Sequence, residues 1–176
     1  MIIIEKNLEQ LTKQYDICDK DLIDDFSLRI RLGRPHHIPK ESHSTIIYGQ
    51  DPDPSEFFSP LQHGKQNITV GPGKQFIACS KDIYKMPSGY FGLLQTKGTL
   101  ARLFVSTTCN DGQIEPGFHG YVTLEIVNHS PWTIELPIGS EVAQLYLIKC
   151  SSEALRPYKG RYAEGALKGP TLAFFP

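Results

Sequence analysis

Apolar and polar residues alternate along most of the chain, and this alternation predicts short strands separated by turns. The clearest run is Phe26–Gly33, in which every second side chain is apolar as far as Leu32. Alternation over four to eight residues is typical of a strand with one buried face. The same pattern predicts further strands at 67–70, 75–80, 90–94, 100–106, 121–128, 133–136 and 142–149. One helix is predicted at 2–15, where Leu8 and Leu11 form a weak helical stripe.

Two segments depart from this pattern. Residues 34–66 are rich in Pro, His, Ser and Asp, and they predict a loop with one short strand at 44–48. Residues 151–176 predict a C-terminal tail, whose apolar end at 172–176 is expected to pack against another part of the protein. Many short strands with frequent turns favour an all-β sandwich or jelly roll, here as one domain over residues 1–176 with a short N-terminal helix.

Composition narrows the classes of partner. The formal net charge of −1 gives no reason to expect nucleic acid or an anionic membrane as a bulk partner, although a local basic cluster could hold a nucleotide. No apolar run is long enough to span a bilayer. The cysteines form no C-x-x-C pair, which favours a reduced, cytoplasmic protein with free thiols. They are Cys18, Cys79, Cys109 and Cys150.

The strand at 121–128 carries a carboxylate where alternation alone does not need one. Val122, Leu124 and Ile126 share one face, so Glu125 lies on the other face between apolar neighbours. We therefore expect Glu125 to be at least partly buried. A buried carboxylate is costly unless it is paired, and Arg102 is the natural partner. A structural ion pair and a catalytic pair both remain open on these residues alone.

Three motifs carry a family resemblance. They read Lys-Gly-Thr-Leu-Ala-Arg at 97–102, Ile-Glu-Pro-Gly-Phe-His-Gly at 114–120 and Thr-Leu-Glu at 123–125. Their order and spacing resemble those of the dCTP deaminase branch of the dUTPase superfamily. The chain departs from the family pattern at Gly98, where the family has a serine, at Glu115, where it has aspartate, and in the tail, which lacks the expected glutamines.

The resemblance implies a distorted jelly roll of the dUTPase-like (β-clip) type that works as a homotrimer. It implies a deoxynucleoside triphosphate, dCTP or dUTP, as substrate, with Mg²⁺ held through the phosphates and no metal ligand from the protein. In the family, the residue that matches Glu125 donates and accepts protons, and the residue that matches Arg102 supports it. The zinc signature of other nucleobase deaminases is missing from the sequence, so the chemistry at the base is expected to need no zinc.

The resemblance also assigns nucleotide contacts. Phe118 matches an aromatic residue under the deoxyribose, although a plain core role is an equal alternative. Tyr158 matches a tyrosine that contacts phosphate, and the tail is expected to close over the nucleotide. The full set of candidate nucleotide-binding residues is Lys97, Gly98, Thr99, Leu100, Ala101, Arg102, Glu115, Phe118, Thr123, Leu124, Gln144 and Tyr158.

Three functions are compatible with these residues. The first is deamination of dCTP to dUTP and ammonia, with Glu125 as the proton shuttle. The second is a diphosphatase that releases pyrophosphate from dUTP or another deoxynucleotide, for which the carboxylate of Glu115 would align a water molecule. The third is a member of the fold that binds nucleotide without catalysis.

Overall fold

The computed structural model describes residues 1–50, 52–109 and 111–173. Its elements, in chain order, are β1 (Ile2–Ile3), α1 (Glu5–Tyr15), η1 (Lys20–Leu22), β2 (Leu28–His37), α2 (Pro54–Phe57), β3 (Gln62–His63), β4 (Asn67–Val70), β5 (Gln75–Lys85), β6 (Tyr90–Thr96), α3 (Gly98–Ala101), β7 (Val105–Ser106), β8 (Gln113–Ile114), β9 (His119–Asn128), β10 (Ile134–Pro137), β11 (Glu141–Lys149) and η2 (Gly165–Leu167).

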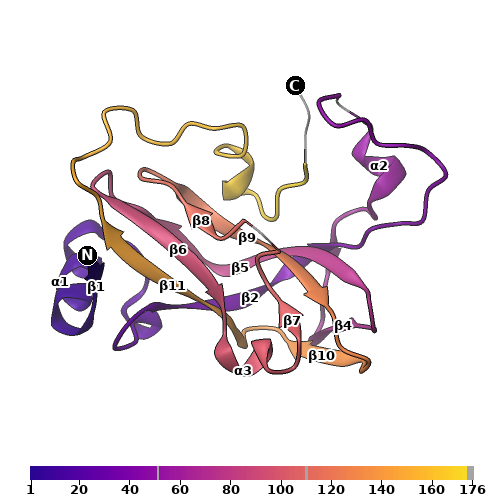
Figure 1. Ribbon diagram of the computed structural model, residues 1–176, viewed down its shortest axis with the longest axis horizontal. Coiled ribbons are helices and arrows are strands. Elements are labelled where there is room, and N and C mark those ends of the chain that lie inside the picture. The colour runs from indigo at the N-terminus through magenta and orange to yellow at the C-terminus, as the bar shows by residue number, and fades with distance from the viewer. Residues whose placement is uncertain (51, 110, 174–176) are drawn as a thin grey trace.

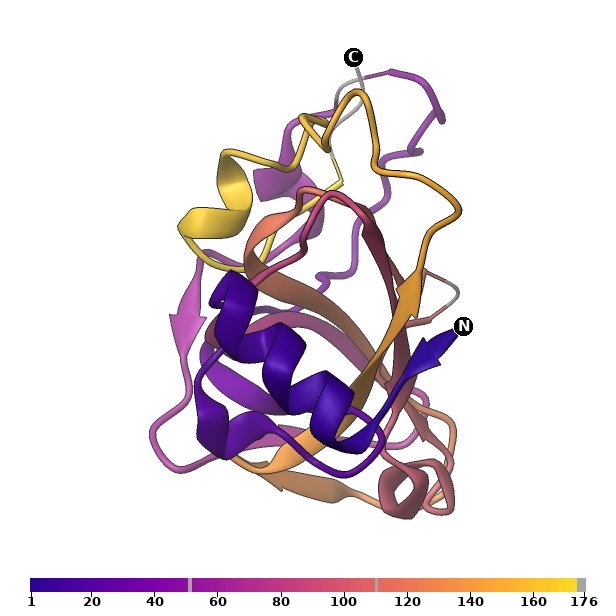
Figure 2. The same ribbon diagram turned by 90° about the vertical axis from the view of Figure 1, so that its left-hand side faces the viewer.

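Over these residues, nine strands form one antiparallel sheet in the order β7-β9-β5-β2-β11-β6-β8, with β1 added beside β11 and β3 beside β2. β4 and β10 form a separate two-stranded sheet. The large sheet curls strongly, as the end-on view shows (Figure 2). The predicted all-β fold with an N-terminal helix is therefore confirmed.

The core lies inside this curl and follows the alternation of the sequence. In β9, Leu124 and Ile126 are fully buried and Val122 nearly so, while the residues between them are half-buried. β2 shows the same rule through Leu28, Ile30 and Leu32, none of which is exposed. Strand side chains alternate between faces, so each strand gives one face to the core and the other to its surroundings.

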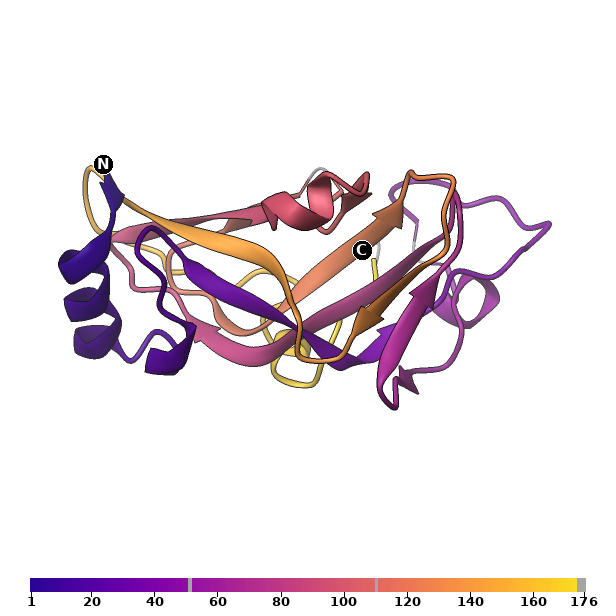
Figure 3. The same ribbon diagram turned by 90° about the horizontal axis from the view of Figure 1, so that it is seen from below.

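The helix α1 covers one end of the molecule. Leu8 and Leu11 are its buried apolar side chains, as the weak stripe predicted. It ends at Asp16, whose φ of 51° is left-handed and lets the N–H of Ile17 bond the carbonyl of Thr12. Viewed along its length, the molecule carries α1 at one end and the segment around α2 at the other (Figures 1 and 3).

Two expectations about local structure are wrong. The segment 44–48 forms no strand, and Ile46 and Ile47 are exposed there because no neighbouring strand pairs with them. The segment 100–106 is not one strand, because hydrogen bonds from the N–H of Ala101 to Lys97 and from Arg102 to Gly98 close the helical turn α3. Only Val105–Ser106 pairs as β7.

The C-terminal tail returns to the sheet and packs on β9. Gly120 makes this approach possible, because a Cβ atom there would lie 2.6 Å from Cβ of Ala166 in η2. Leu172 is buried, in agreement with the expected packing of the apolar end, whereas residues 174–176 lie outside the described residues. Figure 1 shows the tail as the yellow segment above β8 and β9.

The cysteines are free thiols, two of them half-buried, one buried and one exposed. Within the described ranges, no helix combines the length and the apolar character needed to cross a membrane.

Candidate functional site

A cavity of about 490 Å³ lies between β9, the turn after β8 and the C-terminal tail. Five of the predicted site residues line it: Glu115, Phe118, Thr123, Glu125 and Tyr158. They come from three separate segments of the chain, and the curl of the sheet together with the returning tail brings them to one place. The volume is within the range of small-molecule sites, roughly 300–1,000 Å³.

The Glu125 carboxyl is the unusual group of this cavity. Its Oε2 atom is buried and has no hydrogen-bond partner among the described residues. Burial, together with the smaller effect of the charge of Asp111, which also lines the cavity, raises the pKa of Glu125 to about 7. A carboxyl with this pKa exchanges a proton readily near neutral pH, which is the property that general acid–base catalysis requires.

The turn at 115–118 and the tail are locked together beside this carboxyl. The N–H of Tyr158 donates to the carbonyl of Pro116 at 2.8 Å, and the rings of Phe118 and Tyr158 lie 6.2 Å apart. Gly117 has a φ of +90°, and a Cβ there would lie 2.5 Å from Pro157, so only glycine fits between the turn and the tail. Burial raises the pKa of Tyr158.

The tail closes the cavity with residues that lie outside the predicted set of nucleotide-binding residues. The Oγ1 atoms of Thr123 and Thr171 lie 3.0 Å apart, and the N–H of Thr171 donates to Thr123 Oγ1 at 3.2 Å. Leu172 and Arg161 also line the cavity. Among the described residues that line the cavity, Arg161 is the cation, and no local pattern in the sequence distinguishes it from the other basic residues of the tail.

The expected pair of Glu125 and Arg102 does not form within one chain. Arg102 is exposed at the end of α3, and its Nη1 donates to the carbonyl of Gly98 at 3.0 Å. The physical reason is the helical turn, which replaces the expected strand and directs the guanidinium back onto its own backbone. In Figure 1, α3 lies at the lower edge of the molecule and the tail at the upper edge.

The other predicted residues of 97–102 and two further candidates also lie outside the cavity. Lys97 forms an ion pair with Glu141, and the amide of Gln144 donates to Ser27 Oγ at 3.2 Å. The side chain of Leu124 is fully buried in the core, so it cannot contact a nucleotide in the cavity. The predicted nucleotide-binding residues that do not line the cavity, besides Arg102, are Lys97, Gly98, Thr99, Leu100, Ala101, Leu124 and Gln144.

Mg²⁺ is the metal ion that the resemblance implies, and it would be bound mainly through the phosphates of a nucleotide. Among the described residues, no group of three or more His, Cys, Asp or Glu side chains could hold a metal ion. Mg²⁺ usually retains water molecules and is held by one or two carboxylates together with substrate phosphates. The carboxylates of Asp111 and Glu115 line the cavity and fit that supporting role.

The fold and the cavity together define a class: a curled antiparallel β protein in which a tail covers a small-molecule cavity that contains a buried carboxyl. A protein-family model described as "dCTP deaminase-like" matches residues 3–150. The chain belongs to this family of enzymes, which confirms the resemblance seen in its motifs.

Similar proteins agree with this assignment. A protein of Corynebacterium diphtheriae named "dCTP deaminase, dUMP-forming" is 33% identical over 141 residues, which cover 80% of this chain and 75% of the relative. One of Parafrankia with the same name is 32% identical, over 81% of this chain and 71% of the relative. A protein of Aeropyrum pernix named "dCTP deaminase" is 28% identical, over 92% and 90%.

The fold itself is similar to a solved structure. The 2'-deoxycytidine 5'-triphosphate deaminase of Agrobacterium tumefaciens superimposes with a TM-score of 0.62 at 18% sequence identity. The match covers 83% of this chain and 47% of that chain. At this identity the likeness supports the arrangement of strands.

Proposed function

We propose that the protein hydrolyses dCTP to dUTP and ammonia, with Glu125 as the group that moves protons. The observation that carries this proposal is the Oε2 atom of Glu125, which is buried in a cavity of about 490 Å³ and has no hydrogen-bond partner within the described part of the chain. The names of the relatives from Corynebacterium and Aeropyrum support the same substrate.

The reaction balances as dCTP plus water giving dUTP plus ammonia. Ionised Glu125 takes a proton from the water that attacks C4 of the cytosine ring, and protonated Glu125 then returns it so that the amine leaves as ammonia. Within one chain, burial sets a pKa near neutrality for Glu125, which suits a group that must accept and donate a proton within one cycle. Phe118 and Thr123 form the wall of the same cavity, where they would orient the nucleoside.

A second copy of the chain would complete the site. Within one chain, the segment 97–102 lies outside the cavity, yet the exposed Arg102 and the backbone of Gly98 are available to another molecule. We therefore propose a homotrimer in which Arg102 of a neighbouring copy approaches Glu125 and stabilises its ionised form. In this arrangement Gly98 and Thr99 would cradle phosphate, since a glycine backbone allows close approach.

Residues 1–176 would then act as one domain, with 151–176 as a tail that covers the bound nucleotide. Tyr158 and Arg161 come from this tail and line the cavity, where they would meet the phosphates. Mg²⁺, bound through those phosphates, would neutralise their charge.

Release of pyrophosphate is a second candidate activity. The relatives from Parafrankia and Corynebacterium diphtheriae are named as dUMP-forming, and a second hydrolysis, at the α-phosphorus of dUTP, would be needed to produce dUMP and pyrophosphate. Glu115 lines the cavity and supplies a carboxylate that could align the second water. Because glutamate is longer than the family's aspartate by one methylene, and an error of about 1 Å can cost on the order of a hundredfold, this step is the less favoured one.

The decisive experiment is incubation with each deoxynucleoside triphosphate and Mg²⁺, followed by chromatography of the products. Ammonia and dUTP from dCTP are expected. Pyrophosphate with dUMP would support the second activity, and binding without either product would refute catalysis and leave a nucleotide-binding member of the fold.

A further inference from the structure

A second cavity, of about 390 Å³, shares the lining residue Tyr121 with the cavity that contains Glu125, which we call the Glu125 cavity. Three cationic side chains, Arg34, Lys81 and Lys168, line this second cavity together with His63. None of the described residues that line it is Asp or Glu. We refer to it as the cationic cavity.

Two irregularities of the sheet shape this cavity. The pairing of β2 with β5 shifts register between Leu32 and His36, and the pairing of β5 with β9 shifts between Cys79 and Ile83. Ser80 stabilises the second irregularity, because its Oγ accepts from the N–H of Val122 at 2.9 Å and donates to the carbonyl of Asp82 at 2.6 Å. Bulges of this kind often lie beside functional sites.

Among the described residues, no carboxylate neutralises the cations of this cavity, although the Nη1 of Arg34 donates to the carbonyls of Gly64 and Lys65, at 3.1 and 2.6 Å, which leaves its other nitrogen atoms for a ligand. The carboxylate nearest in sequence to Lys81, that of Asp82, is held by two hydrogen bonds from Arg31, at 2.7 and 2.8 Å. Neither Lys81 nor Lys168 takes part in an ion pair with another described residue. The ammonium of Lys81 lies 4.0 Å from the position that a Cβ on Gly139 would occupy, at the turn before β11.

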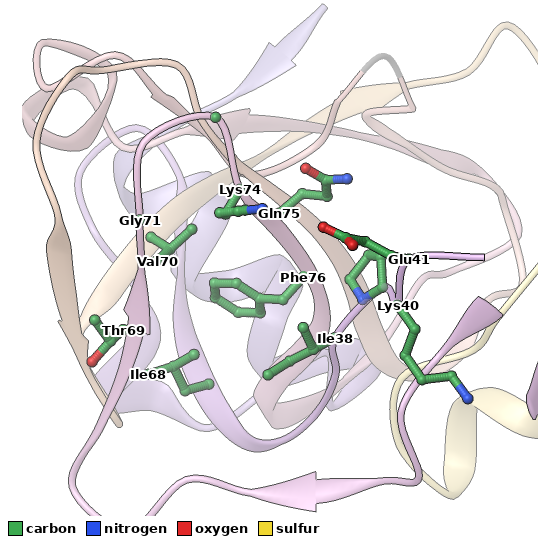
Figure 4. A pocket seen from close by; sticks show the side chains of 12 residues that line it. Ile38, Lys40, Glu41, Ile68, Thr69, Val70, Gly71, Lys74, Gln75 and Phe76 are labelled. Carbon is green, nitrogen blue, oxygen red and sulfur yellow. The ribbon is translucent and has the colours of Figure 1, made fainter. Parts of the chain in front are cut away.

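A third cavity provides a contrast. It has about 330 Å³ of space beside Phe76 and contains Lys40 and Lys74, but Glu41 also lines it. Figure 4 shows apolar side chains at its centre and the ammonium of Lys40 directed away from them. The two cavities are similar in size and differ in charge, so Lys74 offers a matched control for Lys81.

We propose that the cationic cavity binds a phosphate-bearing small molecule, with its oxygen atoms on Arg34, Lys81 and Lys168. Guanidinium and ammonium groups are the usual partners of phosphate in proteins. The cavity volume suits a ligand larger than a single small ion. This site is separate from the Glu125 cavity and does not depend on the proposed deamination.

Occupation of the cationic cavity would also hold the tail. Lys168 and Gly169 line the cationic cavity, whereas Thr171 and Leu172, only a few residues later, close the Glu125 cavity. A phosphate group bridging Lys81 of β5 and Lys168 of the tail would fix the tail against the sheet. The ligand would therefore favour the closed form of the neighbouring cavity, because it binds that form more tightly than an open one.

Isothermal titration of the full chain with inorganic pyrophosphate, at constant ionic strength and without metal, tests the site. Lys81→Gln and Lys168→Gln are each expected to weaken binding by about tenfold, the effect of losing one charged hydrogen bond, while Lys74→Gln leaves it unchanged. A second titration with dCTP distinguishes a free phosphate chain from the phosphates of a nucleotide. The ligand whose affinity depends on Lys81 is the one that occupies the cationic cavity.

Tryptic cleavage after Lys168 gives an independent readout. Pyrophosphate is expected to slow tryptic cleavage of the wild-type tail. In the Lys81→Gln variant, pyrophosphate should no longer slow it. The proposal is overturned if pyrophosphate and dCTP bind both lysine variants as they bind the wild type. It is also overturned if pyrophosphate affinity falls only in Arg161→Gln, since that result would place the anion in the Glu125 cavity. If the protein shows no deamination of dCTP, that result refutes the proposed function and leaves the test of the cationic cavity unaffected.

Discussion

The Arg102→Gln substitution tests whether a second copy supplies the partner of Glu125. Within one chain the buried carboxyl has a pKa of about 7. A guanidinium from a neighbouring copy would favour the charged form and lower that pKa. Removing the guanidinium should return the pKa of Glu125 to the value set by burial, and the rate profile should report the change, because Glu125 must be ionised to accept a proton from water.

The expected magnitude follows from titration of one group. With a pKa of about 7, roughly one tenth of Glu125 is ionised at pH 6 and roughly nine tenths at pH 8. The rate of Arg102→Gln at pH 6 should therefore be about tenfold below its own plateau. The wild type, whose carboxyl has the lower pKa, should keep its plateau to a lower pH.

The assay is ammonia release from saturating dCTP over roughly pH 5.5 to 9, the range that brackets this titration. Arg156→Gln, which removes an exposed tail arginine that does not line the cavity, is the control for charge alone. Arg102→Lys should restore part of the rate that Arg102→Gln loses at low pH, because it keeps a positive charge at this position. If Arg102→Gln lowers the rate by the same factor at every pH, Arg102 does not act through the ionisation of Glu125, and the reasoning fails.

Three further predictions concern the same site. Glu125→Gln should abolish ammonia release while gel filtration shows an unchanged assembly; continued release would remove Glu125 from the mechanism. Gly98→Ser should raise the rate of deamination or leave it unchanged, because the new Cβ meets only the flexible end of Arg102, at 3.2 Å. A large loss in steady-state rate would mean that the site requires glycine. Thr171→Val should speed tryptic cleavage of the tail by about two- to tenfold, the effect of one hydrogen bond to Thr123; an unchanged rate would show that this bond does not hold the tail.

Alternation was sufficient to predict the longer strands, such as β2, β5, β9 and β11, and the placement of the central carboxylate, but it also predicted a strand at 44–48, where none forms. In β9 the pattern gave the buried face of Leu124 and the half-buried position of Glu125, because a strand has a period of two. It was not sufficient at 98–101, where helix and strand patterns are indistinguishable over four residues and only the hydrogen bonds of α3 decide.

The tail marks a second limit of sequence reasoning. The apolar Leu172 indicated that the tail packs, but its site depends on Gly120, which lacks the Cβ that would collide with Ala166. Such a contact joins residues about 46 positions apart, and no local pattern encodes it. The motifs likewise identified 97–102 as a group, but they could not show that these residues lie outside the cavity of their own chain.

The half-buried face of β9 carries residues of both cavities, so the register of this strand decides which side chains reach them. Tyr121 borders both cavities, Thr123 holds the tail and Glu125 supplies the buried carboxyl, each two residues from the next. A shift of one residue would exchange this face with the core face. Ser80 opposes such a shift, because its hydroxyl bonds the N–H of Val122 at the bulge of β5. The interruption in the ladder therefore fixes which side chains face the cavities, and the chemistry of the site depends on it.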